Sequence, residues 1–396
     1  MGLAYLMNTY PITSTTFVRR EINAHEAAGV PVFRFAIRDW AEELVDPRDQ
    51  AEIAKTTYIL KQGIGGLLAR AMREVITHPV GFGRAFKTTL HLATRPGSVG
   101  LKNFAYLLEA VFFKQAAAAQ NVTHVHAHFS TNSTAVALLA RRMGGPSYSF
   151  TAHGPDEFDD TVGNGLAIKV RYAAFVAAIT DYARGVIVTA ADPADEAKVH
   201  VVRCGIDLAE FAPSAPPPNK RIVCVGRLCP AKAQGLLVEA IAPLITEHPT
   251  LELVLIGDGE DRRAIEAQVS ALGLDGHVTL SGWGTGREVR DAIQDARVFA
   301  LPSFAEGLPI VLMESLAIER AVVTTRITGI PELVDAECGW IVPPGDVLAL
   351  REAIAEALSA DTATLARMGA TGRKRVMQSH DQSKNAAALR ALLALG

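Results

Sequence analysis

The stretch VFALPSFAEGLPIVLMESLA occupies residues 298–317 and holds the pattern that decides the fold of the chain. Its first four residues form an apolar run that is typical of a strand buried on both faces. A short loop follows, and Pro309 then favours the first turn of a helix, where the missing N–H of proline has no intrahelical partner in any case. A strand followed at once by a helix is the repeating unit of α/β proteins.

The same alternation continues in both directions from this stretch. Apolar and β-branched runs predict strands at 4–7, 32–37, 122–126, 147–150 and 185–188 and, after a gap, at 221–225, 251–256, 278–281, 298–301 and 321–324. Helices are expected at 17–28, 347–358 and 384–395. We therefore predict an α/β protein with two Rossmann-like, doubly wound domains of parallel strands.

A proline-rich segment, PSAPPPN at 213–219, separates the two series of strands. Its prolines exclude a helix or a central strand, so it is interpreted as a stiff, extended linker. The predicted organisation is a first domain at 1–212, this linker, a second domain at 220–375, and a C-terminal helix at 376–396 that packs back on the first domain.

The composition excludes several classes of protein. Of 396 residues, 49% are apolar and 20% are charged, which gives enough apolar surface for a large core and excludes a disordered chain. The net charge of −3 argues against a nucleic-acid-binding protein. The four cysteines form no C-x-x-C pair and are expected to be buried free thiols. The first residues show no signal-peptide pattern, so a cytoplasmic location is expected.

Residues 55–114 are basic, unlike the rest of the chain. They contain nine Lys or Arg and two Glu, and bulky apolar residues lie between the charges. Such a helical region suits the inner, anionic surface of a membrane. The alternative is a solvated helical insert whose aromatic residues fill the core of the domain.

Three loops that follow strands of the second domain carry residues suited to a nucleotide diphosphate. The loop at 226–235 combines a glycine with two cations, Arg227 and Lys232, which suit a diphosphate and would take the place of a divalent metal. Gly257 and Gly259 follow the next strand. In the stretch quoted above, the amides of Gly307 and Leu308 precede a helix, and such a position attracts phosphate.

These motifs resemble a known family. The segments VGRLCPAK, VLIGDGE, LSGW and FAEGLPIVLMESLA, in this order, are similar to the second domain of retaining glycosyltransferases of family 4, which have the GT-B fold of two domains facing across a cleft. Glu306 and Glu314 match the E-x7-E motif of that family. Upstream, HAHF at 126–129 and TAHGPDEF at 151–158 resemble the subgroup that builds bacterial exopolysaccharides, such as the colanic acid glycosyltransferases.

The resemblance implies a role for each matched residue. Arg227 and Lys232 would hold the donor diphosphate, Glu306 would contact the donor sugar, and Glu314 would contact the ribose. His153 would lie beside the reacting sugar. Backbone near Trp283 would contact the base.

The sequence departs from the family pattern in two loops. Thr13, Ser14 and Thr15 stand where many members have a Gly-Gly loop, so their hydroxyls are expected to bind phosphate or the acceptor. Ala233 stands where a glycine usually follows the phosphate-binding lysine.

The histidines at 124, 126 and 128 alternate along one strand and therefore share a face. Three such histidines could ligate zinc, but a role in lining the site is favoured and no metal is expected. His126, His128 and Asp156 are assigned to the acceptor, with a helix cap as the alternative role of Asp156.

The expected function is transfer of a hexose from a UDP- or GDP-sugar to a saccharide, or to a saccharide linked to polyprenyl diphosphate, with no cofactor besides this co-substrate. Charge that develops on the departing diphosphate would be stabilised by the loop cations and helix amides, and closure of the domains about the linker would exclude water. The alternatives are a GT-B sugar-nucleotide epimerase and a non-catalytic sugar-nucleotide-binding protein.

Overall fold

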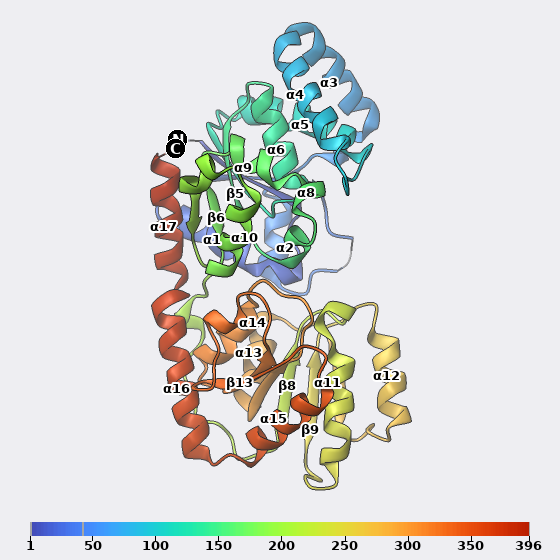
Figure 1. The fold of residues 1–396 in the computed structure, drawn as a ribbon, viewed down its shortest axis with the longest axis vertical. Helices are drawn as coiled ribbons and strands as arrows, with labels where there is room; N and C mark the ends of the chain where they lie inside the picture. Colours follow the sequence, from blue (N-terminus) through green and yellow to red (C-terminus); the bar gives the residue numbers. More distant parts are fainter. Residues whose placement is uncertain (1, 42, 396) are drawn as a thin grey trace. The chain divides into compact units, whose positions relative to one another are not determined.

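The computed structural model describes residues 2–41 and 43–395, which fold into two compact units (Figure 1). One unit contains the chain up to Arg203 and again from Ala386 onward, and the other contains Cys204–Asn385. Each unit has a parallel sheet with helices on both faces, as predicted for doubly wound domains.

The sheet of the first unit has seven strands in the order β3-β2-β1-β4-β5-β6-β7. Their bounds are β1 Leu3–Thr9, β2 Val32–Arg38, β3 Thr56–Tyr58, β4 His124–His128, β5 Ser147–Ala152, β6 Val176–Ala178 and β7 Val199–Val201. The strand order reverses between β1 and β4, because the chain places β2 and β3 on one side of β1 and the later strands on the other.

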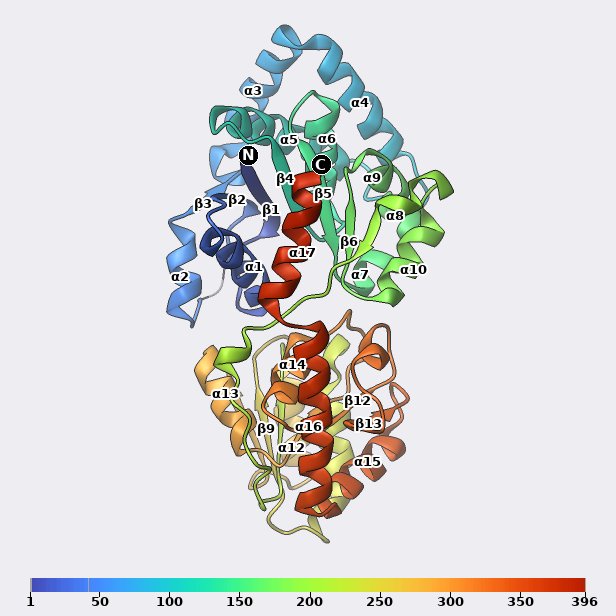
Figure 2. The same cartoon turned by 90° about the vertical axis from the view of Figure 1, so that its left-hand side faces the viewer.

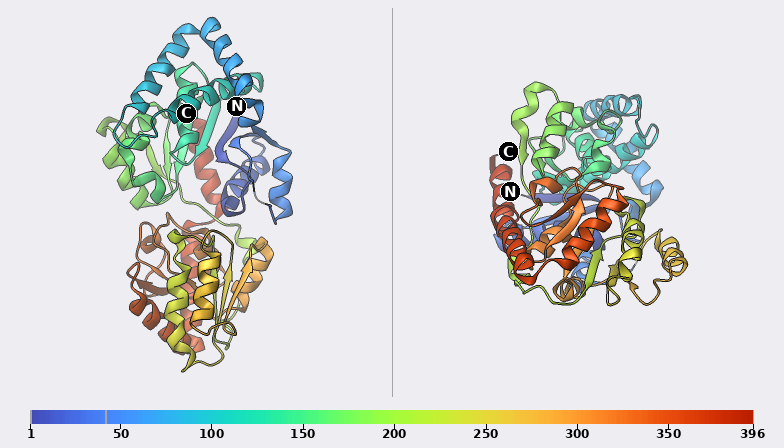
Figure 3. Two further views of the ribbon diagram at one scale, coloured as in Figure 1. Left: turned by 90° about the vertical axis from the view of Figure 1, so that its right-hand side faces the viewer. Right: turned by 60° about the horizontal axis from the view of Figure 1, so that its bottom comes forward.

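The helices of the first unit include the large insert that the basic composition of 55–114 indicates. Helices α3 (Gly63–Thr77) and α4 (Pro79–Ala93) pack on α5 (Lys102–Ala119), which lies against the sheet (Figure 3). The remaining helices are α1 Thr16–Ala27, α2 Pro47–Ile53, α6 Asn132–Arg142, α7 Pro155–Phe158, α8 Thr161–Asn164, α9 Leu166–Tyr172 and α10 Asp181–Ala190. Among the described residues, no helix has both the length and the apolar character that crossing a bilayer requires.

One predicted strand is wrong. Residues 185–188, Gly-Val-Ile-Val, lie inside α10, whose first turn is capped by the Thr180 hydroxyl. Ala183 and Ile187, four residues apart, are the buried positions, so burial follows the helical period and not the alternation of a strand. The chain forms a strand just before this helix instead: β6 covers Val176–Ala178.

The sheet of the second unit has six strands in the order β10-β9-β8-β11-β12-β13. Their bounds are β8 Arg221–Val225, β9 Glu252–Ile256, β10 Val278–Gly282, β11 Val298–Leu301, β12 Val322–Thr325 and β13 Gly339–Val342. The helices are α11 Gln234–Ile241, α12 Arg262–Ala271, α13 Gly286–Asp295, α14 Ile310–Ala317, α15 Val347–Ser359 and α16 Thr362–Ser379. Here the order reverses between β8 and β11.

The proline-rich segment 213–219 belongs to the second unit and is not a linker between the units. Proline offers no N–H, so this segment presents mainly carbonyl oxygens, and buried guanidinium groups bind them. Arg320 donates to the carbonyls of Ser214 and Ala215, and Arg297 donates to Pro217. These bonds fix the segment on the second unit, which corrects both the predicted boundary and the expected hinge.

Helix α17 (Gln382–Leu395) returns to the first unit. Leu389 and Leu393 join the core formed by Leu3, Tyr5 and their neighbours, and Arg390 donates to the carbonyl of Ala24. Figure 2 shows α17 along the strands of the first sheet. The C-terminal segment that packs on the first unit begins at Ala386. This is ten residues later than the predicted start at 376, because α16 belongs to the second unit.

Candidate active site

Two of the loops predicted to bind the donor, those after β8 and β11, lie where the strand order of the second unit reverses. The loop after β8 and the loop after β11 leave adjacent strands at the same edge, and the Phe304 amide donates to the carbonyl of Ala231 over 2.9 Å. Ligands of open α/β sheets bind at this edge and at this point of the sheet. Pro309 is the N-cap of α14, as the sequence pattern predicts.

Lys232 from the first of these loops and Glu306 from the second are in contact. The Nζ atom of Lys232 lies 2.5 Å from Oε1 of Glu306, and the Ser303 hydroxyl donates to the same oxygen over 2.7 Å. The Glu306 side chain is almost buried, whereas that of Lys232 is 23% exposed. A cation and a carboxylate held together at the carboxyl ends of two strands can bind one ligand: the cation binds its phosphate and the carboxylate accepts hydrogen bonds from its sugar hydroxyls.

The glycines of the second unit allow close packing of its loops. Gly257 and Gly259 have φ angles of +145° and +155°, and a Cβ on Gly257 would lie 2.0 Å from the carbonyl oxygen of Gly226. Gly226 itself has a φ of +156° and stands beside the Lys232 side chain. The packing of the loops is therefore enough to explain why residues 257 and 259 are glycines. The predicted contact of Gly257 and Gly259 with the donor stays a prediction.

The other residues predicted for the donor lie elsewhere in the same unit, and none of the contacts described for Arg227, Trp283 or Glu314 joins them to the Lys232–Glu306 pair. Arg227 is half exposed and forms a 3.0 Å ion pair with Glu260, which is equally exposed. Glu314 is buried within α14, and Trp283 is partly buried just after β10. The carbonyl of Gly307 accepts hydrogen bonds from Thr328, and Leu308 is buried beside it.

In the first unit, His124 and His126 bond to the neighbouring strand β5. Both rings contact the Ser149 hydroxyl at 2.8 Å, and His126 also contacts the Thr151 hydroxyl at 2.8 Å. His126 is completely buried and both its ring nitrogens are engaged. The ring therefore has its polar atoms occupied within the protein, and the predicted contact of His126 with the acceptor stays a prediction.

His153 follows β5, the strand beside β4, at the carboxyl ends of the strands of the first sheet. Its Nε2 lies 2.9 Å from Nδ1 of His128, the last residue of β4. The ring centroids of Phe17 and Phe129 lie 4.8 and 4.6 Å from the ring centroid of His153. Because His128 is completely buried, any contact between this pair and an acceptor must be made by His153.

A buried carboxylate that sequence reasoning missed holds the backbone at His153. Glu157 accepts hydrogen bonds from the amides of His153, Gly154 and Ser130, at 2.6, 3.1 and 2.5 Å. Glu157 is the N3 residue of α7 and caps the start of this helix. Asp156, for which the sequence suggested a capping role, is exposed. The signal in the sequence was a Glu three residues after a glycine at a helix start.

Lys169 is a second residue missed at this site. Its buried ammonium donates to the carbonyls of Ser130 and Thr131 and to the side chain of Asn164, at 2.5, 2.9 and 2.7 Å. Burial lowers the pKa of Lys169 to about 7. Lys169 and Glu157 together fix the loop after β4 against the loop after β5.

The residues Thr13, Ser14 and Thr15 form a short 3-10 turn directly before α1. The Thr15 side chain is buried and donates to the carbonyl of Ile12, so its hydroxyl hydrogen is used within the turn. Thr13 is partly exposed, and the side chain of Ser14 lies outside the described part of the structure. The predicted phosphate or acceptor contact of this turn stays a prediction.

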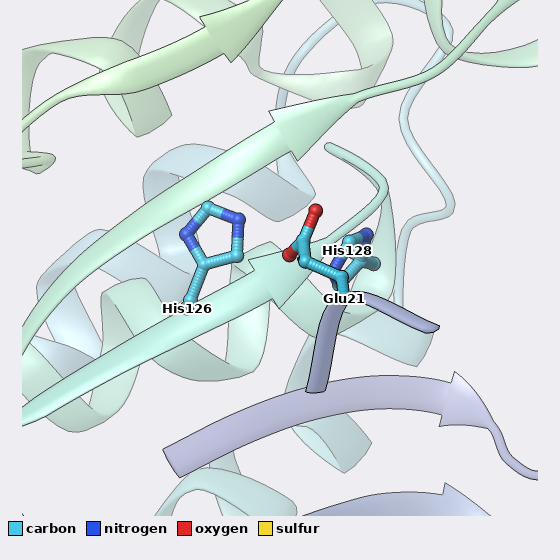
Figure 4. A group of neighbouring side chains, drawn as sticks. All are labelled: Glu21, His126 and His128. Atoms are coloured by element: carbon cyan, nitrogen blue, oxygen red, sulfur yellow. The ribbon is translucent and has the colours of Figure 1, made fainter. Parts of the chain in front are cut away.

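A cluster that could hold a metal ion includes Glu21 of α1 in place of His124. Figure 4 shows the Glu21 carboxylate beside His126 and His128, and one ligand atom from each lies within 4.8 Å of the others. The two nitrogens of His126 are bonded to hydroxyls, and the Tyr5 phenol donates to Glu21 over 2.5 Å. Hydrogen bonds within the protein thus account for most of these ligand atoms.

The fold is that of GT-B glycosyltransferases, as comparison with solved structures shows. A sucrose-phosphate synthase from Thermosynechococcus elongatus is 20% identical, with a TM-score of 0.75 over all of both chains. The Anabaena protein Alr3699/HepE, solved in complex with UDP-glucose, is 17% identical with the same score and coverage. At these identities the likeness concerns the fold alone.

The sequence comparisons concern mainly the second unit. The family described as "Glycosyl transferases group 1" matches residues 219–360. A putative colanic acid biosynthesis glycosyltransferase, WcaL of Escherichia coli (strain K12), is 33% identical over 195 residues, 47% of this chain and 48% of the relative. The chain thus spans about half the length of the curated relatives it matches. The predicted resemblance to glycosyltransferases is confirmed, and assignment to family 4 stays a prediction.

Proposed function

We propose that the chain is a retaining glycosyltransferase of cell-surface glycan synthesis, which moves a hexose from a UDP- or GDP-sugar to a saccharide or a polyprenyl-diphosphate-linked saccharide. The observation that carries this proposal is the contact between Lys232 and Glu306 at the strand-order reversal of a group 1 glycosyltransferase domain. The solved relative with bound UDP-glucose and the colanic acid relative support the choice of donor and pathway class.

The residues of the second unit would stabilise the departing nucleotide. As the anomeric C–O bond breaks, negative charge would grow on the diphosphate, and the Lys232 ammonium, paired with Glu306 in the structure, would offset that charge. Arg227, now paired with Glu260 at the surface, would exchange this weak partner for phosphate. In this proposal Glu306 orients the sugar and the two cations do the work of a divalent metal.

The residues of the first unit would bind the acceptor. His153 is held by its backbone to Glu157 and by its ring to His128, so its position is set before any substrate binds. The leaving phosphate would accept the proton of the acceptor hydroxyl in a same-face reaction, since no carboxylate other than Glu306 is proposed beside the sugar.

The test is a turnover assay with a panel of UDP- and GDP-hexoses, with and without oligosaccharide and polyprenyl-diphosphate-saccharide acceptors. Transferase activity predicts that nucleoside diphosphate is released only with an acceptor, that the new bond keeps the anomeric configuration of the donor, and that EDTA has no effect. Conversion of the sugar nucleotide without acceptor would indicate an epimerase instead. Donor binding with no turnover on any acceptor would indicate a non-catalytic binding protein.

We also propose that α3 and α4 place the protein on an anionic membrane surface at the inner face of the cell membrane. Ile64, Leu68, Met72 and Ile76 recur every four residues on α3 and are between 52% and 75% exposed. Arg73, Arg84 and Lys87 are exposed on the same two helices. Residues 63–93 are all described, and their one carboxylate, Glu74, is buried against Lys114.

This pattern fits a lipid surface better than a water-facing insert. A stripe of exposed apolar side chains flanked by cations gains both from insertion into the interface and from attraction to anionic headgroups. The alternative considered from the sequence, in which the bulky residues fill the core, holds for Leu67 and Phe113 but not for the stripe on α3.

A further inference from the structure

Gln234, the first residue of α11, is a buried glutamine whose side chain reaches back to the start of the loop after β8. The residue is 1% exposed. Its Nε2 atom donates to the carbonyl of Arg227 over 2.9 Å and, in a longer bond of 3.5 Å, to the carbonyl of Gly226. The side chain therefore joins the two ends of the loop that carries Arg227 and Lys232.

The bond to Arg227 completes a clamp on one peptide group, which links Arg227 to Leu228. The carbonyl of this peptide accepts from Gln234, and its N–H, which belongs to Leu228, donates to the carbonyl of Asp258 over 2.9 Å. Because a peptide group is planar and both of its polar atoms are held, the plane cannot turn without breaking a hydrogen bond. The backbone that carries the Arg227 side chain is thus fixed.

The other polar atom of Gln234 shows that this residue is not explained by packing. Its Oε1 atom is buried and has no hydrogen-bond partner among the described residues. A buried acceptor without a partner destabilises a folded chain, and an apolar side chain of the same length, such as methionine, would avoid this loss. What the amide supplies, and methionine would not, is the hydrogen bond to the loop carbonyls.

We propose that Gln234 is a positioning residue that holds the backbone at Arg227 where the guanidinium can bind the diphosphate of the donor. The inference rests on the proposed function, which assigns this ligand to Arg227. The Arg227 side chain is half exposed and pairs with the equally exposed Glu260. Its backbone is therefore the part of the residue that the protein orders before a ligand binds, and this order lowers the entropy lost on binding.

The test is a double-mutant cycle between Gln234 and Arg227, measured in the full chain by isothermal titration calorimetry with UDP and GDP. Gln234→Met removes the donor at almost constant length. It should weaken binding of whichever nucleotide the wild type binds by about tenfold, and by less than about twofold in the Arg227→Ala background. In turnover assays Gln234→Met should raise the donor KM about tenfold and leave the acceptor KM unchanged.

Gln268→Met is the matched control, because Gln268 is a partly buried glutamine that donates to another backbone carbonyl, that of Gly235. This variant should bind the nucleotide like the wild type. Should Gln234→Met not fold, Gln234→Glu takes its place, since an ionised carboxyl keeps the size of the side chain and donates no hydrogen bond.

Three results would overturn the proposal. One is an unchanged nucleotide affinity in Gln234→Met, and another is an unchanged affinity in Arg227→Ala. The third is a tenfold loss on adding Gln234→Met to Arg227→Ala, because Gln234 would then affect the nucleotide by a route that does not pass through Arg227.

Amide hydrogen exchange, followed by NMR without any ligand, separates this inference from the proposed function. The Leu228 amide should be protected in the wild type and in Gln268→Met, and should exchange at least about tenfold faster in Gln234→Met. Equal exchange of Leu228 in Gln234→Met and the wild type would overturn the clamp. If the clamp is observed but the wild type binds neither UDP nor GDP, the proposed function fails while the hold of Gln234 on this loop stands.

Discussion

At the residue scale, the account depends on a few buried charges that neighbouring polar groups hold in place. Lys232 and Glu306 neutralise each other on one edge of the second sheet, and Glu157 gathers three backbone amides at His153 in the first. Sequence motifs predicted Lys232 and Glu306, because both stand in loops directly after strands. Glu21 and Lys169 were missed because a single charge on a helix has no spacing pattern that distinguishes it from a solvated one. Glu157 was missed although its position three residues after Gly154 marks it as a capping residue.

We expect Lys232→Ala and Glu306→Ala each to lower turnover by ~10²-fold or more, which is the typical loss when one transition-state charge stabiliser is removed. The measurement is initial rate with saturating acceptor. Matched controls are Lys374→Ala and Glu356→Ala, which remove exposed charges from α16 and α15 of the same unit. Near-wild-type rates in both site variants would contradict the assigned site.

Glu109 leads to a prediction about stability and pH. It is buried on α5 with an oxygen that has no hydrogen-bond partner among the described residues, and burial raises its pKa to about 7, above the ordinary value of 4.5. Between about pH 4.5 and 7 the folded chain binds more protons at this site than the unfolded chain, so stability falls as pH rises. Glu109→Gln should therefore raise the Tm by a few degrees at pH 8 and by much less at pH 4.5, measured by calorimetry. A lower Tm at pH 8 would contradict this.

At the element scale, most of the predicted strands are confirmed within a few residues, because buried parallel strands read as continuous apolar runs. The strand predicted at 185–188 is wrong because valine and isoleucine occur in helices too: these residues lie inside α10, where Ile187 is a buried position. The role of 213–219 could not be predicted, since the arginines that fix it come from residues about eighty or more positions away.

The exposed stripe of α3 gives a prediction at this scale. The double variant Leu68→Ser, Met72→Ser should lose most of its sedimentation with phosphatidylglycerol vesicles at low salt, and the wild type should be released at high salt. The control Leu348→Ser, Met377→Ser removes two exposed apolar side chains from the second unit and should bind like the wild type. Equal binding to neutral and anionic vesicles would contradict the proposed surface.

At the scale of the whole molecule, two doubly wound units each bring candidate residues to the point where their strand order reverses. The sequence predicted this architecture because each unit repeats the strand–loop–helix pattern. It also predicted that a helix from the end of the chain packs on the first unit, although this packing begins at Ala386 and not at residue 376.

The most direct test of the central claim is the affinity of the full chain for UDP, GDP and their hexose derivatives, measured by isothermal titration calorimetry in the presence of EDTA. The account predicts that one of these nucleotides binds the wild type and Lys374→Ala alike, and binds Lys232→Ala at least tenfold more weakly, about 1.4 kcal/mol. Equal affinity of Lys232→Ala and the wild type would show that the diphosphate does not bind at this loop and would contradict the account.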